Sequence, residues 1–250
     1  MSHNTDALKL LDSFYERLNK REAKEMLLMG SKWDSVSKRL DSMILELASK
    51  EDLSKNQLFR LDLYKEFLKE SKAQTKIFTE FSNEIIIDNE RVYAKAGLDL
   101  TQSQISLVKV NFQKIPLEAT NKMIGLTSDG TKLYDLIAKS YPQSIEMLTN
   151  TLVQGIALGQ NPMRTASLMK EDMDFNLKRA RTIARTEQLR VMRETSREQM
   201  IESKVVKEWE RIEREDACDE CQAVDGQRYS LDEIFDTHPN CRGAMLPIVE

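Results

Sequence analysis

Helix-breaking residues are scarce in the first hundred residues, and this scarcity constrains the fold more than any other feature of the sequence. No proline precedes Pro116, and no glycine lies between Gly30 and Gly97. The same stretch is rich in leucine, lysine, glutamate and methionine, which favour helices. Apolar residues recur in it at spacings of three and four, as one buried helix face requires. Examples are Leu8, Leu11, Tyr15, Leu18, Trp33, Val36, Leu40, Ile44 and Leu47. We therefore expect two or three long helices over residues 5–95, packed as a hairpin or bundle, with a break near 52–55.

The middle of the chain is divided into shorter pieces by glycine and proline. The pattern predicts short helices over 132–140 and 143–158. The sequence from Gly159 to Pro162 then predicts a helix stop, followed by a new start at Met163. A further amphipathic helix is expected from about Asn176 to Ser203.

This last helix carries a row of arginines opposite its apolar stripe. The row consists of Arg179, Arg190, Arg193 and Arg197. Such a row could follow the phosphates of DNA. No aromatic residues or base-reading motif accompany it, so a solvated helix face is the favoured interpretation. Glu187 lies at the edge of the apolar stripe, where an unpaired carboxylate is costly, and we expect a structural pairing with a nearby arginine.

The overall composition favours a soluble protein. Charged residues make up 31% of the chain, and the net charge is only -4. No stretch approaches the roughly 18 apolar residues that a membrane span needs. The N-terminal sequence has no basic region followed by an apolar one, so a secretion signal is not expected. Basic residues outnumber acidic ones over 151–200 and the reverse holds over 201–250, so the charge changes sign near residue 200.

The last fifty residues change character towards short strands. Val205–Ile212 alternates in part as a strand does, and Trp209 is its expected buried anchor. Asp225 and Gly226 predict a turn. Two further strands are expected over 228–231 and 244–249, the second closing the fold.

Between these strands all three cysteines of the chain and one of its two histidines lie together. Cys218 and Cys221 are separated by two residues, and so are His238 and Cys241, with sixteen residues between the two pairs. A two-residue spacer lets both members of a pair reach one ion from a tight turn. Zn²⁺ favours four such ligands in a tetrahedron. We therefore predict one structural zinc ion per chain, bound by Cys218, Cys221, His238 and Cys241.

Alternatives to a zinc ion are open for this cluster. Three cysteines fit a disulfide framework poorly, and a redox Cys-x-x-Cys pair would leave the matching His238–Cys241 spacing without a role. An iron–sulfur cluster and a small module without metal are further alternatives. A catalytic cysteine–histidine pair lacks an evident third group, and four protein ligands close a zinc ion to substrate. We therefore expect no enzymatic activity.

The order of motifs resembles that of the phage head-morphogenesis family, the minor head proteins related to protein F of phage Mu. The resemblance covers roughly residues 130–250. Its elements are Gly155–Pro162, Ala184-Arg-Thr-Glu187, Trp209, the Cys-x-x-Cys pair, Asp225-Gly226 and His238-Pro-Asn-Cys-Arg242. Many members have a further cysteine where this chain has Gly243, which leaves four candidate ligands.

The resemblance implies a minor capsid protein of the virion, located in the head interior or at the portal vertex and assembled in the host cytoplasm. Its implied partners are the portal protein and the major capsid or scaffold protein, with double-stranded DNA as a further contact in some phages. No membrane or small-molecule substrate is implied. Some relatives continue into toxin domains, which we do not expect after Glu250. The alternative from the residues is a zinc-module adaptor that binds nucleic acid.

We thus expect a mainly α-helical protein in three parts. The first is a helical N-terminal arm over 1–97, without a recognised motif. The second is a helical central domain over 98–203. The third is a small α+β module over 204–250 that is stabilised by zinc, because some 45 residues have little core of their own.

Overall fold

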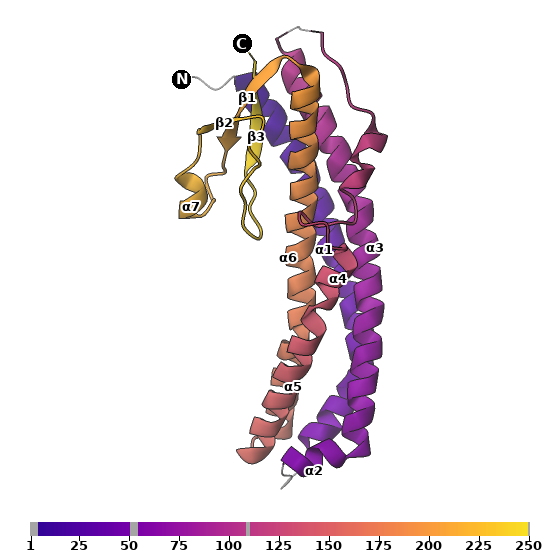
Figure 1. The fold of residues 1–250 in the computed structure, drawn as a ribbon. Coiled ribbons are helices and arrows are strands. Elements are labelled where there is room, and N and C mark those ends of the chain that lie inside the picture. Colours follow the sequence, from indigo (N-terminus) through magenta and orange to yellow (C-terminus); the bar gives the residue numbers. More distant parts are fainter. Residues whose placement is uncertain (1–4, 51–54, 109–110, 250) are drawn as a thin grey trace. The chain divides into compact units, whose positions relative to one another are not determined.

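A computed structural model describes residues 5–50, 55–108 and 111–249. These residues form a mainly helical protein with a small antiparallel sheet near the C-terminus, as predicted (Figure 1). The helices are α1 (Thr5–Ala48), α2 (Lys55–Arg60), α3 (Asp62–Ser106), α4 (Leu133–Ala138), α5 (Ser140–Ala157), α6 (Pro162–Ser203) and α7 (Asp219–Gln222), with a 3₁₀ helix, η1 (Leu117–Lys122), between α3 and α4. The strands are β1 (Val206–Ile212), β2 (Arg228–Ser230) and β3 (Ala244–Val249).

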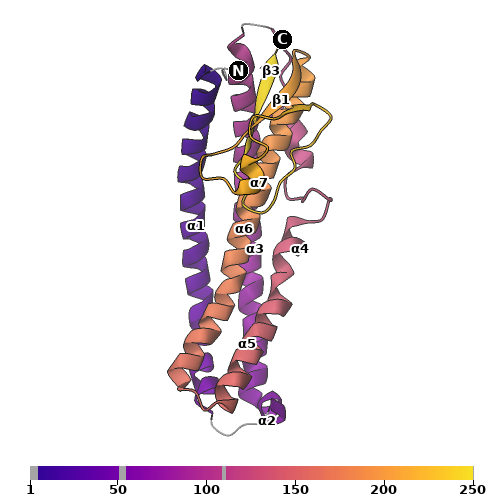
Figure 2. The same ribbon diagram turned by 90° about the vertical axis from the view of Figure 1, so that its left-hand side faces the viewer.

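The long N-terminal helices expected over 5–95 are present as α1 and α3, with the short α2 between them (Figure 2). The predicted break near 52–55 lies largely outside the described residues. Helix α1 buries one residue at every third or fourth position, which is the pattern of a single buried face. The apolar stripes read from the sequence therefore serve as core.

Helix α3 continues past Gly97, contrary to the expectation of an end there. A Cβ atom at position 97 would lie 2.4 Å from the carbonyl oxygen of Met192 on α6. The hydroxyl of Ser196, one turn further along α6, donates a hydrogen bond to the carbonyl of Gly97. Gly97 thus allows two helices to approach closely and does not end one.

Helix α6 is also longer than predicted, because it begins at Pro162 and runs without interruption to Ser203. The side chain of Asn161 accepts a hydrogen bond from the backbone N–H of Met163, which caps the start of the helix. Pro162 occupies the first helical position, where its missing N–H costs nothing. No glycine or proline follows before Ser203, so the helix expected from Asn176 merges with the one that starts at Pro162.

The chain divides into two compact units, each assembled from segments that are distant in sequence. The sheet unit comprises Met1–Lys24, Ile85–Gly130 and Thr182–Glu250. The helical unit comprises Glu25–Glu84 and Thr131–Arg181. The division into consecutive domains over 1–97, 98–203 and 204–250 stays a prediction, and the compact units group the chain differently.

The helical unit has an aromatic core. Trp33 packs edge-to-face on Phe78, with ring centroids 4.8 Å apart. The indole N–H of Trp33 donates to the carboxylate of Asp174 over 2.7 Å, so the buried ring has its polar atom paired. Tyr64 is likewise buried, and its hydroxyl is 2.8 Å from that of Thr149.

The sheet unit has two clusters of buried apolar side chains. One joins α1, α3, α6 and β3, and consists of Leu11, Tyr15, Leu18, Tyr93, Ala96, Leu100, Leu189, Met192 and Ala244. The other surrounds Trp209 and includes Ile105, Met200, Val206 and Met245. Trp209 is 1% exposed and stacks on Tyr229, which confirms it as the anchor of β1.

The sheet has the order β2-β1-β3, with both neighbours antiparallel to β1. Trp209 pairs with Tyr229 on β2 and with Pro247 on β3. Gly226, with a φ of +73°, forms the predicted turn before β2. Within the described ranges, no helix has both the length and the apolar character needed to cross a membrane.

Candidate metal centre

The first cysteine pair lies on the turn between β1 and β2. Cys218 is the residue before α7, and Cys221 lies within this single-turn helix. The backbone N–H of Gln222 donates to the carbonyl of Cys218 over 2.9 Å, which fixes the turn. Both thiols are thereby brought to the same end of the sheet.

The second pair lies in the loop between β2 and β3. The backbone N–H of Cys241 donates to the carbonyl of His238 over 3.1 Å, and Asn240 between them has a φ of 65°. The Nδ1 atom of His238 lies 2.9 Å from the carbonyl oxygen of Pro239. Because a carbonyl only accepts, Nδ1 carries the proton and Nε2 keeps its lone pair for a metal ion.

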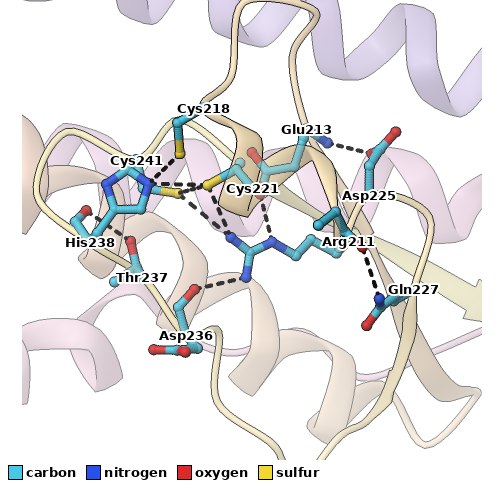
Figure 3. Close-up of polar contacts among 12 residues, drawn as sticks. Arg211, Glu213, Cys218, Cys221, Asp225, Gln227, Asp236, Thr237, His238 and Cys241 are labelled. Carbon is cyan, nitrogen blue, oxygen red and sulfur yellow. Dashed lines mark hydrogen bonds and ion pairs between the residues drawn. The ribbon is translucent and has the colours of Figure 1, made fainter.

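The two pairs meet around a common point (Figure 3). The Nε2 atom of His238 is 3.3 Å from the sulfur of Cys218 and 3.1 Å from that of Cys221. The sulfurs of Cys221 and Cys241 are 3.8 Å apart. In a tetrahedral zinc site, two sulfurs lie about 3.8 Å apart and a sulfur and a nitrogen about 3.6 Å apart. The Cys221–Cys241 separation equals the first of these values, and the two separations from His238 are slightly shorter than the second. All three cysteines are free thiols.

The candidate ligand atoms form two overlapping groups. One consists of Cys218, Cys221 and His238, and the other of Glu213, Cys221 and Cys241. In each group the ligand atoms lie within 4.8 Å of one another, so each could hold a metal ion. The sequence predicted all three members of the first group and the two cysteines of the second. It did not predict Glu213 as a candidate ligand.

Burial separates the three thiols. Cys221 and Cys241 are each 3% exposed, whereas Cys218 is exposed to solvent. Burial raises the pKa of the Cys221 thiol to about 12, and contacts with Cys218 and Cys241 act in the same direction. A thiolate at this position therefore needs a nearby positive charge, which a bound divalent cation supplies.

Arg211 and Glu213 are the two site residues that the sequence did not reveal. The guanidinium of Arg211 lies 3.5 Å from the sulfur of Cys221 and 3.9 Å from that of Cys241. Its Nε donates to the carboxylate of Glu213 over 2.6 Å. Burial lowers the pKa of Arg211, but the pairing with Glu213 and the two nearby sulfurs outweigh it and raise the pKa above its usual value. The only signal in the sequence was a charged residue inside a strand.

The absence of a side chain at Gly243 leaves room for the carboxylate of Glu213. A Cβ atom at position 243 would lie 2.3 Å from a carboxylate oxygen of Glu213. The space that a side chain at position 243 would need is thus filled by the carboxylate that orients Arg211.

The loop that carries His238 and Cys241 is also bonded to helices of the sheet unit. Arg193 on α6 donates to the carbonyls of Cys241 and Gly243 over 2.7 and 2.8 Å. The hydroxyl of Tyr15 on α1 lies 3.3 Å from the same carbonyl of Gly243. Next to Cys241, Arg242 donates to the carboxylate of Glu22, which also pairs with Arg185.

Three of the four arginines proposed for DNA contact are occupied within the sheet unit. Arg190 bonds to Glu187, Glu194 and the carbonyl of Leu126. Arg193 is 5% exposed, and Arg197 donates to the carbonyl of Leu231. The favoured interpretation of the row as a solvated face is therefore wrong, because tertiary contacts cover this side of α6. Arg179 lies in the helical unit and is partly buried.

Glu187 has the arginine partner that the sequence predicted. Its carboxylate accepts a hydrogen bond from Nε of Arg190 over 2.7 Å, and Glu187 is 8% exposed. Both residues line a cleft of about 450 Å³ next to His238.

Fold and site together define a class: a helical protein with a three-stranded module that brings one histidine and three cysteines together. Residues 146–246 match the family model described as Phage Mu protein F like protein. This confirms, over the matched segment, the resemblance read from the sequence. The match contains α6, β1, β2, the first residues of β3 and all four candidate ligands, and residues 1–145 and 247–250 lie outside it. The chain matches none of the curated proteins and none of the solved structures with which it was compared.

Proposed function

We propose that this protein is a minor capsid component that acts in phage head assembly. The observation that carries the proposal is the family match over 146–246, which agrees with the order of motifs in the sequence. We place the protein at the portal vertex or in the procapsid interior, with assembly in the host cytoplasm. Its proposed partners are the portal protein and the major capsid or scaffold protein.

An affinity-capture experiment tests this role. The full chain is immobilised and exposed separately to the portal, scaffold and major capsid proteins encoded by the same genome. We expect at least one to be retained, while the portal protein of an unrelated phage passes through. Failure to retain any of the three, as single proteins and as procapsids, would refute the proposal.

We also propose that Cys218, Cys221, His238 and Cys241 bind one structural Zn²⁺. The support is the 3.8 Å separation of two sulfurs, the proximity of Nε2 of His238 to two thiols and the hydrogen bond that fixes its tautomer. Such an ion would join two turns of a module that is too small to have a large core. Four protein ligands leave no position for a substrate, so we propose a structural and not a catalytic ion.

Metal analysis of the purified chain tests the zinc proposal. We expect about one zinc ion per chain and its loss in the Cys221→Ser variant. A matched control is Ser230→Ala, which alters a hydroxyl in the same module outside the cluster. Absence of metal from the natural chain, together with an unchanged melting temperature after addition of a chelator, would refute the zinc centre.

DNA contact remains a subsidiary proposal for the row of arginines on α6. Binding through phosphates falls steeply as salt rises. Three of these guanidinium groups already bond within the sheet unit, so we expect weak binding of duplex DNA at low salt and none at physiological salt. Tight binding that persists at physiological salt would favour the alternative of a nucleic-acid adaptor.

A further inference from the structure

Arg211 is a buried cation placed directly against two of the candidate metal ligands. It is 6% exposed and lies near the end of β1, just before the turn that carries Cys218 and Cys221. Its Nη2 atom faces the sulfurs of Cys221 and Cys241. Figure 3 shows the guanidinium directed at the cluster, with the sulfurs on one side and Glu213 on another.

The orientation of this guanidinium is fixed by contacts at each of its nitrogens and at its face. Nε donates to Glu213 over 2.6 Å, and Nη1 donates to the carbonyl of Asp236 over 2.8 Å. The central carbon of the group lies 4.2 Å from the ring centroid of Phe235. A planar group held in this way keeps its remaining N–H directed at the sulfurs.

A second buried arginine lies on α6 near the same ring. The guanidinium of Arg193 is 4.5 Å from the ring centroid of Phe235, and it bonds to backbone carbonyls of the ligand loop. No bond from Arg193 to a sulfur is present among the described residues. Both arginines thus lie close to the candidate metal centre, but Arg211 contacts ligand sulfurs and Arg193 contacts backbone carbonyls.

Charge balance explains why cations are needed here. A divalent ion with three thiolates and a neutral imidazole has one net negative charge, and Glu213 adds another. Arg211 and Arg193 supply two positive charges, which offset these two negative charges. An uncompensated charge in such a place is costly.

We propose that Arg211 is a positioning residue of the metal centre, which holds the thiolates of Cys221 and Cys241 through N–H···S hydrogen bonds and raises the affinity for a divalent, thiolate-binding cation. This inference rests on the proposed zinc centre. Groups that hydrogen-bond to metal ligands commonly change metal affinity by about 10- to 100-fold when they are removed. Hydrogen bonds to a thiolate also lower the energy of its electrons, so they affect the spectrum of a coordinated metal.

The test uses the full chain loaded with Co²⁺ or Zn²⁺, and compares Arg211→Gln with two controls. Arg193→Gln removes a buried arginine that contacts the same loop but no sulfur, and Arg214→Gln removes an exposed arginine nearby. Zinc affinity is measured by competition with a chromophoric chelator, and the thiolate-to-cobalt charge-transfer band by absorption. Circular dichroism verifies that each variant retains its helices.

We expect Arg211→Gln to lower zinc affinity by about 10- to 100-fold and to shift the charge-transfer band to longer wavelength. Arg193→Gln should lower affinity without shifting the band, and Arg214→Gln should change neither. If Arg211→Gln does not fold, Arg211→Met, which keeps an unbranched side chain beside the ring of Phe235, gives the same readouts.

Two results would overturn the inference while leaving the zinc centre intact. One is a variant of Arg211 with natural affinity and an unshifted band, and the other is an equal band shift in Arg193→Gln. If the natural chain binds neither metal, the zinc centre itself is refuted, and with it the role of Arg211.

Discussion

Replacement of Gly97 by alanine tests whether α3 and α6 are packed as closely as the structure shows. On intrinsic propensity alone, alanine in the middle of a helix is favoured over glycine by about 1 kcal/mol. The new Cβ atom, however, would lie 2.4 Å from the carbonyl oxygen of Met192, about 1 Å inside an ordinary contact. The atom that must move belongs to a helix backbone, and overpacking of this kind costs about 1–3 kcal/mol. We therefore expect a net loss of up to about 2 kcal/mol.

Gly30→Ala provides the matched control. It makes the same substitution inside a long helix, but the nearest atom that a Cβ would meet is Nη2 of Arg181, a side-chain atom that donates to the carbonyl of Met26 and can move more easily than a helix backbone. We expect this variant to lose less stability than Gly97→Ala, because the gain in helix propensity of about 1 kcal/mol offsets the displacement of one side chain. The assay is thermal unfolding followed by circular dichroism, where a loss of 1 kcal/mol lowers the melting temperature by about 2–4 °C in a chain of this size. A Gly97→Ala variant as stable as Gly30→Ala would refute the close approach of the two helices.

Three further changes probe the surroundings of the metal centre. Glu22→Gln removes a carboxylate shared by two arginines, and we expect the free energy of unfolding, measured with denaturant, to fall by about 1–3 kcal/mol. An unchanged free energy of unfolding would show that these ion pairs do not stabilise the fold. Burial raises the pKa of the Tyr15 phenol to about 12, so its stabilising contribution is complete below pH 10 and is lost as the pH rises from 10 to 12. The unfolding free energy of Tyr15→Phe should therefore fall less steeply over that range than that of the natural chain, and parallel curves would contradict this. Glu187→Gln should weaken the pairing with Arg190 and lower the melting temperature. A hydrolase or transferase activity that disappears in this variant while the fold persists would disprove our expectation that the protein is not an enzyme.

The sequence predicted local structure well where the pattern of neighbouring residues determined it. The scarcity of helix breakers was sufficient to predict α1 and α3, and the alternating residues around Trp209 were sufficient to predict β1. The two-residue spacing within Cys218–Cys221 and within His238–Cys241 was sufficient to predict two tight turns, because such a spacer favours a turn whatever surrounds it.

Features that depend on contacts between distant segments could not be predicted in this way. Gly97 indicated a helix end because glycine weakens a helix, but the structure uses its small size against α6. The arginines of α6 indicated a solvated face because nothing in their local sequence reveals the loop that covers them. Arg211 was missed for the same reason, since its partners lie on a turn and a loop that follow it in the chain.

The unequal exposure of the three thiols has a consequence for the kinetics of the proposed centre. Cys221 and Cys241 are buried, whereas Cys218 faces solvent. An incoming chelator, oxidant or alkylating reagent therefore reaches Cys218 first. In the proposed centre, the bond from Cys218 would therefore be the first to open during ligand exchange, and its opening would limit the lifetime of a bound ion.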